Sequence, residues 1–236
     1  MQVAANLADV NDRIAAACLR AGRIATDVTV VAVTKYAETE WVRELVAEGV
    51  RDLGESRPQQ LVERAGAFGE YVRWHLIGHL QRNKARKVLP IAVLIHSVDT
   101  MRLLETLERL AEETETSPRV LLEVNISGEA AKHGFSPQEL AANWDAVLAC
   151  QRVCVDGLMT MAPAGDSPED ARPCFRRLRD LRDELRDRSP KTLSLPELSM
   201  GMSGDYEVAV EEGATLVRIG SRLFEGLRDG YGTLDQ

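Results

Sequence analysis

A lysine follows a run of apolar residues near the start of the chain. Val30, Val31 and Val33 are typical of a strand buried inside a sheet, and Lys35 comes after a single threonine. A lysine at the end of a strand is usually a solvated charge. Its other chemical use is as a nucleophile, because an unprotonated lysine amine attacks an aldehyde to form a Schiff base. Residues elsewhere in the chain must decide between these two interpretations.

Small and hydroxyl residues gather in two later segments. The stretch "SMGMSGDYE" places Ser203 and Gly204 where a helix begins, and "RIGS" places Gly220 and Ser221 directly after a strand. The first segment is also compatible with an ordinary serine N-cap. Backbone N–H groups and hydroxyls at such positions bind phosphate. An amine, an anion cup and Arg218 together favour a cofactor that has both an aldehyde and a phosphate, which describes pyridoxal 5′-phosphate (PLP).

The four histidines favour no metal site. His75 and His96 lie within apolar runs, which is typical of hydrogen-bonded core residues. Their spacing with His79 and His133 matches no common zinc template, so we predict no metal.

Composition excludes several classes of partner. The formal net charge of -8 predicts repulsion of nucleic acid and of anionic membranes, so neither is an expected partner. The basic residues of "RRLRDLRDELRDR" alternate with acids, which predicts a solvated helix face. We find no secretory signal and no membrane-length apolar stretch, and expect a cytoplasmic protein. The cysteines lack CxxC spacing and are expected to be buried thiols; they are Cys18, Cys150, Cys154 and Cys174.

Strand-like and helix-like segments alternate along the chain. After an amphipathic helix at about 4–21, eight strand-like segments occur between about 28 and 228, each followed by a helix-like segment. Ser136, Pro137 and Glu139 predict a capping box that opens one helix reaching about residue 150. Eight units in this length favour an α/β fold, a closed (β/α)8 TIM barrel with an extra N-terminal helix, in a single domain over 1–236. The candidate residues follow strands, so the barrel gathers them at its C-terminal mouth.

These motifs together resemble a known family. The stretches "AVTKY", "WHLIGHLQRNK", "HSVD", "VNISGEAAKHGF", "GLMTMAP", "SMGMSGDYE" and "RIGS" occur in order over about 28–226. They resemble the pyridoxal phosphate homeostasis proteins, which are similar to the barrel domain of alanine racemase, the fold type III PLP-binding fold. The chain departs from the family pattern at Ser56, where asparagine is common, and at Tyr36, where threonine is common.

The resemblance implies a set of cofactor contacts. Lys35 would hold PLP as a Schiff base, Ser203 would bind the phosphate with Gly220 and Ser221, and Arg218 would face the pyridine nitrogen. Asn125 would lie near the ring, and His75 would line the mouth. The residues expected at the cofactor are Lys35, His75, Asn125, Met202, Ser203, Gly204, Arg218, Gly220 and Ser221.

The resemblance also implies a function. We expect a PLP carrier in vitamin B6 homeostasis that delivers PLP to PLP-dependent apoenzymes, without catalytic residues. One alternative is a PLP-dependent amino-acid racemase of the alanine racemase type, and a second is a regulatory interaction protein that exposes PLP status to partner enzymes. Racemisation needs an acid and a base on opposite faces of the substrate carbon, and Tyr36 offers a group for only one face. We expect no second domain over the mouth and a monomeric protein.

Overall fold

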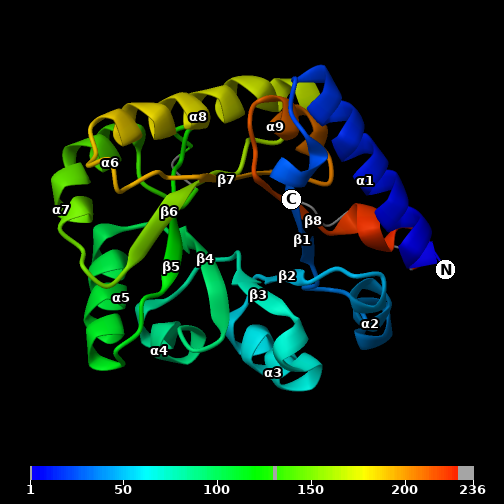
Figure 1. The fold of residues 1–236 in the computed structure, drawn as a ribbon, viewed down its shortest axis with the longest axis horizontal. Helices are drawn as coiled ribbons and strands as arrows, with labels where there is room; N and C mark the ends of the chain where they lie inside the picture. The colour runs from blue at the N-terminus through cyan, green and yellow to red at the C-terminus, as the bar shows by residue number, and fades with distance from the viewer. Residues whose placement is uncertain (1, 130–131, 228–236) are drawn as a thin grey trace.

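Eight parallel strands close into a barrel in chain order, with β1 hydrogen-bonded to β8 (Figure 1). The structure is a computed structural model that describes residues 2–129 and 132–227. The predicted (β/α)8 barrel is confirmed, while its expected end near 228 lies outside the described residues. The strands are β1 (Thr29–Val33), β2 (Asp52–Glu55), β3 (Arg73–Leu76), β4 (Ala92–Val98), β5 (Arg119–Glu123), β6 (Cys154–Met159), β7 (Glu197–Met202) and β8 (Leu216–Ile219).

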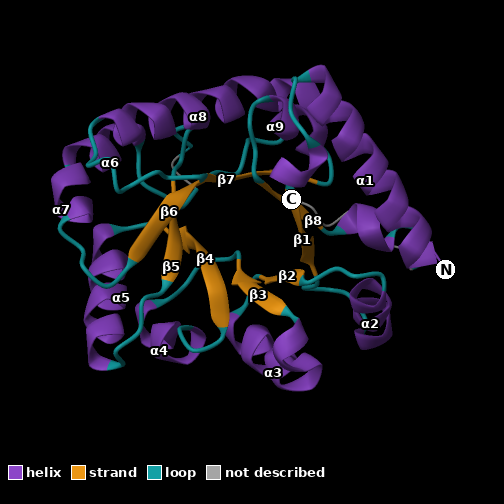
Figure 2. Cartoon of the chain, viewed as in Figure 1, coloured by secondary structure: helices purple, strands orange, loops and turns teal. Residues whose placement is uncertain are grey.

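Helices surround the ring of strands (Figure 2). They are α1 (Gln2–Arg20), α2 (Thr39–Ala47), α3 (Pro58–Phe68), α4 (Ala85–Val88), α5 (Met101–Glu113), α6 (Pro137–Ala142), α7 (Trp144–Leu148), α8 (Arg172–Asp187) and α9 (Tyr206–Glu211). Short 3-10 turns complete the connections: η1 (Ala25–Asp27), η2 (Gly69–Tyr71), η3 (Arg82–Lys84), η4 (Pro168–Ala171) and η5 (Ser221–Phe224).

Burial on both faces explains why the strands are almost continuously apolar. Outward side chains such as Leu53 and Leu122 are fully buried in the main core that the helices cover. A second, smaller cluster fills part of the barrel interior, with contributions from five different strands. Its members are Val31, Leu94, Leu121, Met159 and Leu216. A parallel barrel covered by helices requires both layers.

Two expectations need correction. The segment opened by Ser136 forms two helices, α6 and α7, because the chain turns at Asn143; the Ser136 hydroxyl still accepts the Glu139 N–H at 3.1 Å. All four cysteines are free, but Cys154 is exposed and Cys150 is only partly buried. Cys154 is exposed because it is the first residue of β6, where the strand emerges from the covered layer.

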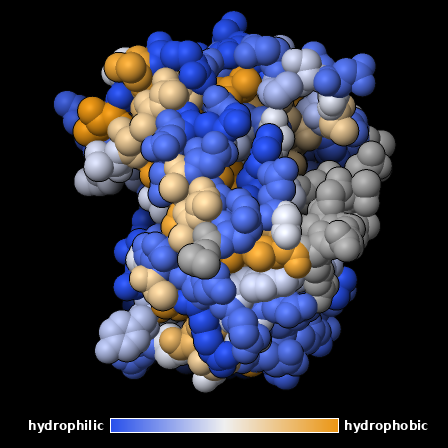
Figure 3. All heavy atoms as spheres, turned by 90° about the vertical axis from the view of Figure 1, so that its right-hand side faces the viewer, coloured by the Kyte–Doolittle hydropathy of each residue, from blue (hydrophilic) through white to orange (hydrophobic). Residues whose placement is uncertain are grey.

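The N-terminal helix α1 packs beside α9 and η5 (Figure 1). Val3, Leu7, Val10 and Ile14 are buried on its inner face. The outer face that carries α1 and α2 is mostly hydrophilic, with apolar side chains in separate spots (Figure 3). Among the described residues, no helix is both long and apolar enough to cross a bilayer.

Candidate cofactor-binding site

The loops after β7 and β8 form a cup of donor groups. Ser203, which follows β7, is only 8% exposed, and its Oγ accepts the N–H of Gly220 at 3.2 Å and of Arg222 at 3.5 Å. The turn that carries Ser203 is fixed because the Asp205 carboxylate accepts the Met202 N–H at 2.6 Å. A hydroxyl and two converging backbone N–H groups are suited to the oxygens of a phosphate.

This cup borders a cavity of about 860 Å³ at the C-terminal mouth of the barrel. The cavity lies between the loops that follow β5, β6, β7 and β8. Lys132 lines its far edge and pairs with Glu129 at 2.6 Å. Of the residues expected at the cofactor, Met202, Ser203, Gly204 and Ser221 line this one cavity.

Arg218 lies in the barrel interior behind the cup. Its guanidinium donates to Ser199 Oγ at 2.6 Å and to the Thr160 carbonyl at 3.0 Å. Burial lowers the pKa of Arg218 to about 10, and the nearby Asp205 and Glu123 carboxylates oppose that shift. The group therefore keeps its charge at neutral pH and is held in one orientation.

Lys35 follows the end of β1, one strand away from the cup. β1 and β8 pair in register, and a Cβ on Gly220 would lie 3.3 Å from Val33 Cβ. Lys35 is half-buried, and its Nζ lies 5.1 Å from the centroid of the exposed Tyr36 ring. Lys35 is not among the residues that line the 860 Å³ cavity, so the structure places it on the neighbouring part of the same rim.

A buried clamp fixes the turn that carries Lys35. Thr34 donates its hydroxyl to the fully buried Glu55 carboxylate at 2.6 Å, and Arg64 pairs with the same carboxylate at 3.1 Å. Arg64 also donates to the Ala37 carbonyl at 2.8 Å. Burial raises the pKa of Glu55, and the contacts with Thr34 and Arg64 oppose the shift. Sequence reasoning missed this clamp, although Glu55 at a strand end was a visible signal.

His75 lies inside the barrel, and its expected contact with the cofactor stays a prediction. It is 4% exposed inside the barrel, with Nε2 at 2.9 Å from the Asp52 carboxylate and Nδ1 at 2.9 Å from His96 Nε2. His75 lies within β3, in register with Gly54 of β2, and its side chain points into the barrel. The interpretation of His75 and His96 as hydrogen-bonded core residues is confirmed.

The two histidines belong to a buried polar chain that ends at Arg218. His96 Nδ1 lies 2.8 Å from the Ser199 hydroxyl, which in turn accepts from Arg218. Burial lowers the pKa of His96 well below its usual value, and the neighbouring His75 and Arg218 act in the same direction. When both imidazoles are neutral, Ser199 donates to His96, His96 to His75, and His75 to Asp52, so every donor meets one acceptor. The chain holds the Ser199 oxygen toward Arg218.

Asn125 uses its side-chain amide within its own loop. The NH₂ group donates to the Glu129 carbonyl at 2.8 Å, and the carbonyl oxygen accepts the Gly128 N–H at 3.0 Å. Asn125 thereby shapes the loop that brings Glu129 and Lys132 to the cavity. The structure does not bring its amide to the cup formed by Ser203.

Sequence reasoning also missed Glu123, the last residue of β5. It is 4% exposed, and burial, with a smaller effect of the Asp99 carboxylate, raises the pKa of Glu123 to about 7. The Arg218 charge opposes this shift. Glu123 therefore places a titrating carboxyl close to the Arg218 guanidinium near neutral pH.

The site combines a closed barrel, a lysine after its first strand and an anion cup after its last two strands. The sequence matches the family described as "Alanine racemase, N-terminal domain" over residues 10–227. Within that class, the chain is 41% identical to the pyridoxal phosphate homeostasis protein of Aquifex aeolicus, over 95% of this chain and 98% of the relative. The human protein of the same name is 36% identical, over 93% of this chain and 84% of the relative. The chain belongs to the pyridoxal phosphate homeostasis protein family.

Solved structures agree with this assignment. PipY of Synechococcus elongatus PCC7942, solved with PLP bound, has a TM-score of 0.81 and 36% identity, covering 94% of this chain and 99% of its own. Alanine racemase of Clostridium difficile 630 has a TM-score of 0.71 and 13% identity, and this chain spans 56% of it. The second similarity shows the shared fold alone.

Proposed function

We propose that this chain binds PLP and carries it within the cell as part of vitamin B6 homeostasis, without substantial catalysis. The observation that carries the proposal is the Ser203 cup, which meets Gly220 beside the strand end that bears Lys35. The donors in the cup match a phosphate, and a nearby amine matches an aldehyde. The family name of the relatives and the PLP-bound PipY structure support the same cofactor.

The chain's own groups have distinct roles in this proposal. PLP, when bound, supplies a reactive aldehyde on an electron-withdrawing pyridine ring. Lys35 would hold the aldehyde covalently, and Ser203 with the N–H groups of Gly220 and Arg222 would hold the phosphate. Arg218 would donate to the ring nitrogen, and its positive charge would keep a proton off that atom. An unprotonated ring withdraws electrons weakly, which suits a protein that only holds PLP or a racemase with strong flanking bases, and this chain offers a basic group for only one face of a substrate carbon.

Delivery and location are parts of the same proposal. We propose that the chain acts as a cytoplasmic monomer that passes PLP to PLP-dependent apoenzymes. The four free cysteines are consistent with a reducing compartment. The position of Lys35 on the rim, where its side chain is only partly buried, favours release of the cofactor to a partner. Gel filtration of the PLP-loaded chain tests the monomer, and transfer to an added apoenzyme tests delivery.

The test is covalent labelling. Full-length protein is mixed with PLP, reduced with borohydride, digested and examined by mass spectrometry. The label is expected on Lys35, and it should be lost in Lys35→Ala but kept in Lys191→Ala, an exposed matched control. Lys132, which lines the cavity, is the competing amine. A label on Lys132 would overturn the site assignment.

The phosphate cup and the absence of catalysis have their own tests. Ser203→Ala should weaken PLP binding roughly tenfold, about 1.4 kcal/mol, while Ser136→Ala, which changes a helix cap far from the cup, should leave it unchanged. Optical rotation of L-alanine, L-serine or L-lysine should stay constant with the PLP-loaded protein. Steady racemisation that disappears in Lys35→Ala contradicts the carrier function.

A further inference from the structure

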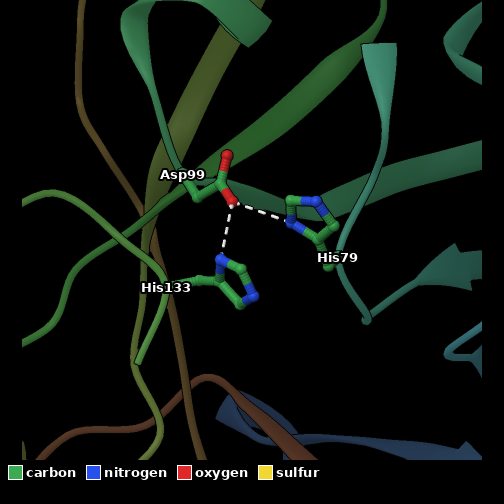
Figure 4. A group of neighbouring side chains, drawn as sticks. All are labelled: His79, Asp99 and His133. Atoms are coloured by element: carbon green, nitrogen blue, oxygen red, sulfur yellow. Dashed lines mark hydrogen bonds and ion pairs between the residues drawn. The ribbon is translucent and has the colours of Figure 1, made fainter. Parts of the chain in front are cut away.

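Two histidines and an aspartate converge on the rim of the barrel, apart from the residues of the cup. His79 Nδ1 lies 2.9 Å from Asp99 Oδ2, and His133 Nδ1 lies 3.6 Å from the same oxygen (Figure 4). The two imidazole rings stack with centroids 4.4 Å apart. One ligand atom from each residue lies within 4.8 Å of the others. Three donor atoms therefore face a common point from three different loops.

The local structure fixes the carboxylate in the middle of this group. Asp99 is 5% exposed at the end of β4, and its second oxygen accepts the Thr100 hydroxyl at 3.4 Å. Thr100 is itself held as the N-cap of α5, where its hydroxyl accepts the Leu103 N–H at 3.3 Å. A partner on the second oxygen orients a carboxylate, as outer residues do in metal sites.

The backbone also fixes the position of each histidine. Gly78, before His79, offers its carbonyl to the Ser97 hydroxyl at 2.6 Å. Gly134, after His133, has φ +110°, and a Cβ there would lie 2.9 Å from the Glu123 carbonyl oxygen. Packed backbone thus brings each imidazole to the carboxylate, while the rings remain open to solvent, with 43% and 60% of the side chains of His79 and His133 exposed.

The donor set selects the kind of cation. Two imidazole nitrogens and one carboxylate oxygen suit Zn²⁺ and related divalent transition metals, whereas Mg²⁺ and Ca²⁺ prefer oxygen ligands throughout. Three protein ligands leave a fourth position of a tetrahedral ion for water. Two stacked imidazoles share a single carboxylate oxygen here, and a divalent cation placed between them would contact all three groups at once.

We propose that His79, Asp99 and His133 form a Zn²⁺-binding site that ties together the loops after β3, β4 and β5. The last of these loops also carries Glu129 and Lys132 to the cavity. The ion therefore holds in place one wall of that cavity. Zn²⁺ binding does not require PLP, since none of the three ligands belongs to the cup or to the lysine turn.

Isothermal titration with ZnCl₂ tests the site, using the full-length chain without added PLP in a non-chelating buffer. One equivalent of Zn²⁺ should bind. His79→Gln, Asp99→Asn and His133→Gln should each weaken binding at least about tenfold, the lower end of what even outer-shell changes cause. Asp145→Asn, an exposed acid on α7, and Cys154→Ser, which removes the exposed thiol, should leave binding unchanged. Failure to bind, or binding that survives all three ligand changes, overturns the proposal.

Proton NMR of the imidazole rings provides a second, independent result. The chain has only four histidines, and two of them, His75 and His96, are buried in the barrel. Zn²⁺ should shift the ring signals of His79 and His133 and leave the other two in place. Because the His133 side chain is mostly exposed, His133→Gln should fold normally and permit assignment of its signal. Shifts confined to His75 and His96, or no shifts, contradict the site.

Discussion

At the scale of single residues, a chain of hydrogen bonds crosses the barrel interior and has a charged residue at each end. Arg218 lies at the mouth end, and Asp52, at the start of β2, lies at the other end. Burial would raise the pKa of Asp52, but hydrogen bonds from His75 and Arg73 outweigh it and lower the pKa to about 2. An ionised Asp52 can only accept, so it sets the direction in which His75 donates.

Asp52 should therefore make folding depend on pH in the acid range. A lowered pKa gives stability that is present above the unfolded value of 3.8 and is lost as the pH falls from about 4 toward about 2. The shift corresponds to about 2 kcal/mol of unfolding free energy. Urea denaturation of Asp52→Asn should show a loss of this size at pH 7 that shrinks near pH 3. Asp12→Asn, an exposed acid on α1, should show neither effect; a loss for Asp52→Asn that is constant with pH would contradict the linkage.

At the scale of elements, the loops after β2 and β3 touch closely through Gly78. A Cβ at this position would lie 2.3 Å from the Ser56 carbonyl oxygen, too close for any residue but glycine. Ser56 is one of the two departures from the family pattern, and its backbone, not its side chain, makes this contact. The contact sets the start of the loop that delivers His79 to Asp99.

Gly78→Ala should force these loops apart. We expect a loss of about 2–3 kcal/mol in unfolding free energy, as is usual for overpacking against rigid neighbours. Gly66→Ala is the matched control, because Gly66 is exposed in the last turn of α3 with nothing within 4 Å of an added Cβ. That change should stabilise the protein by about 0.5–1 kcal/mol through helix propensity. Urea denaturation of both variants tests the pair, and equal effects would mean that the Ser56 contact relaxes freely.

At the scale of the whole molecule, structural features that repeat along the chain could be predicted from the sequence. Apolar strands and amphipathic helices follow local periodicity, so the eight units, the barrel and the strand-end residues of the cup could be predicted. The chain from Asp52 to Arg218 could not, because its members sit singly in β2, β3, β4, β7 and β8 and meet only after closure. The group of His79, Asp99 and His133 was missed for the same reason, since no spacing marks residues from three loops.

Closure also links the first helix to the last described turn. Asn6 of α1 donates to the Leu223 carbonyl at 3.1 Å and to the Glu225 carbonyl at 3.0 Å. Leu223 lies in η5, which begins at Ser221 beside the cup. Ion pairs between Arg13 and Glu207 at 3.2 Å add a second link from α1, to α9. The N-terminal helix thus supports the phosphate cup from outside by packing on η5.

Removing the Asn6 amide should change the geometry of the cup, because Asn6 holds η5 in place. Asn6→Ala leaves two backbone carbonyls without their donor, which should cost about 1 kcal/mol of stability. PLP affinity should fall about three- to tenfold, within the range of coupling between sites that share no contact. Asn11→Ala, an exposed asparagine on the same helix, should leave affinity unchanged. Fluorescence titration with PLP measures both variants, and equal affinity for Asn6→Ala and the unmodified chain would show that the cup holds its shape without the Asn6 hydrogen bonds.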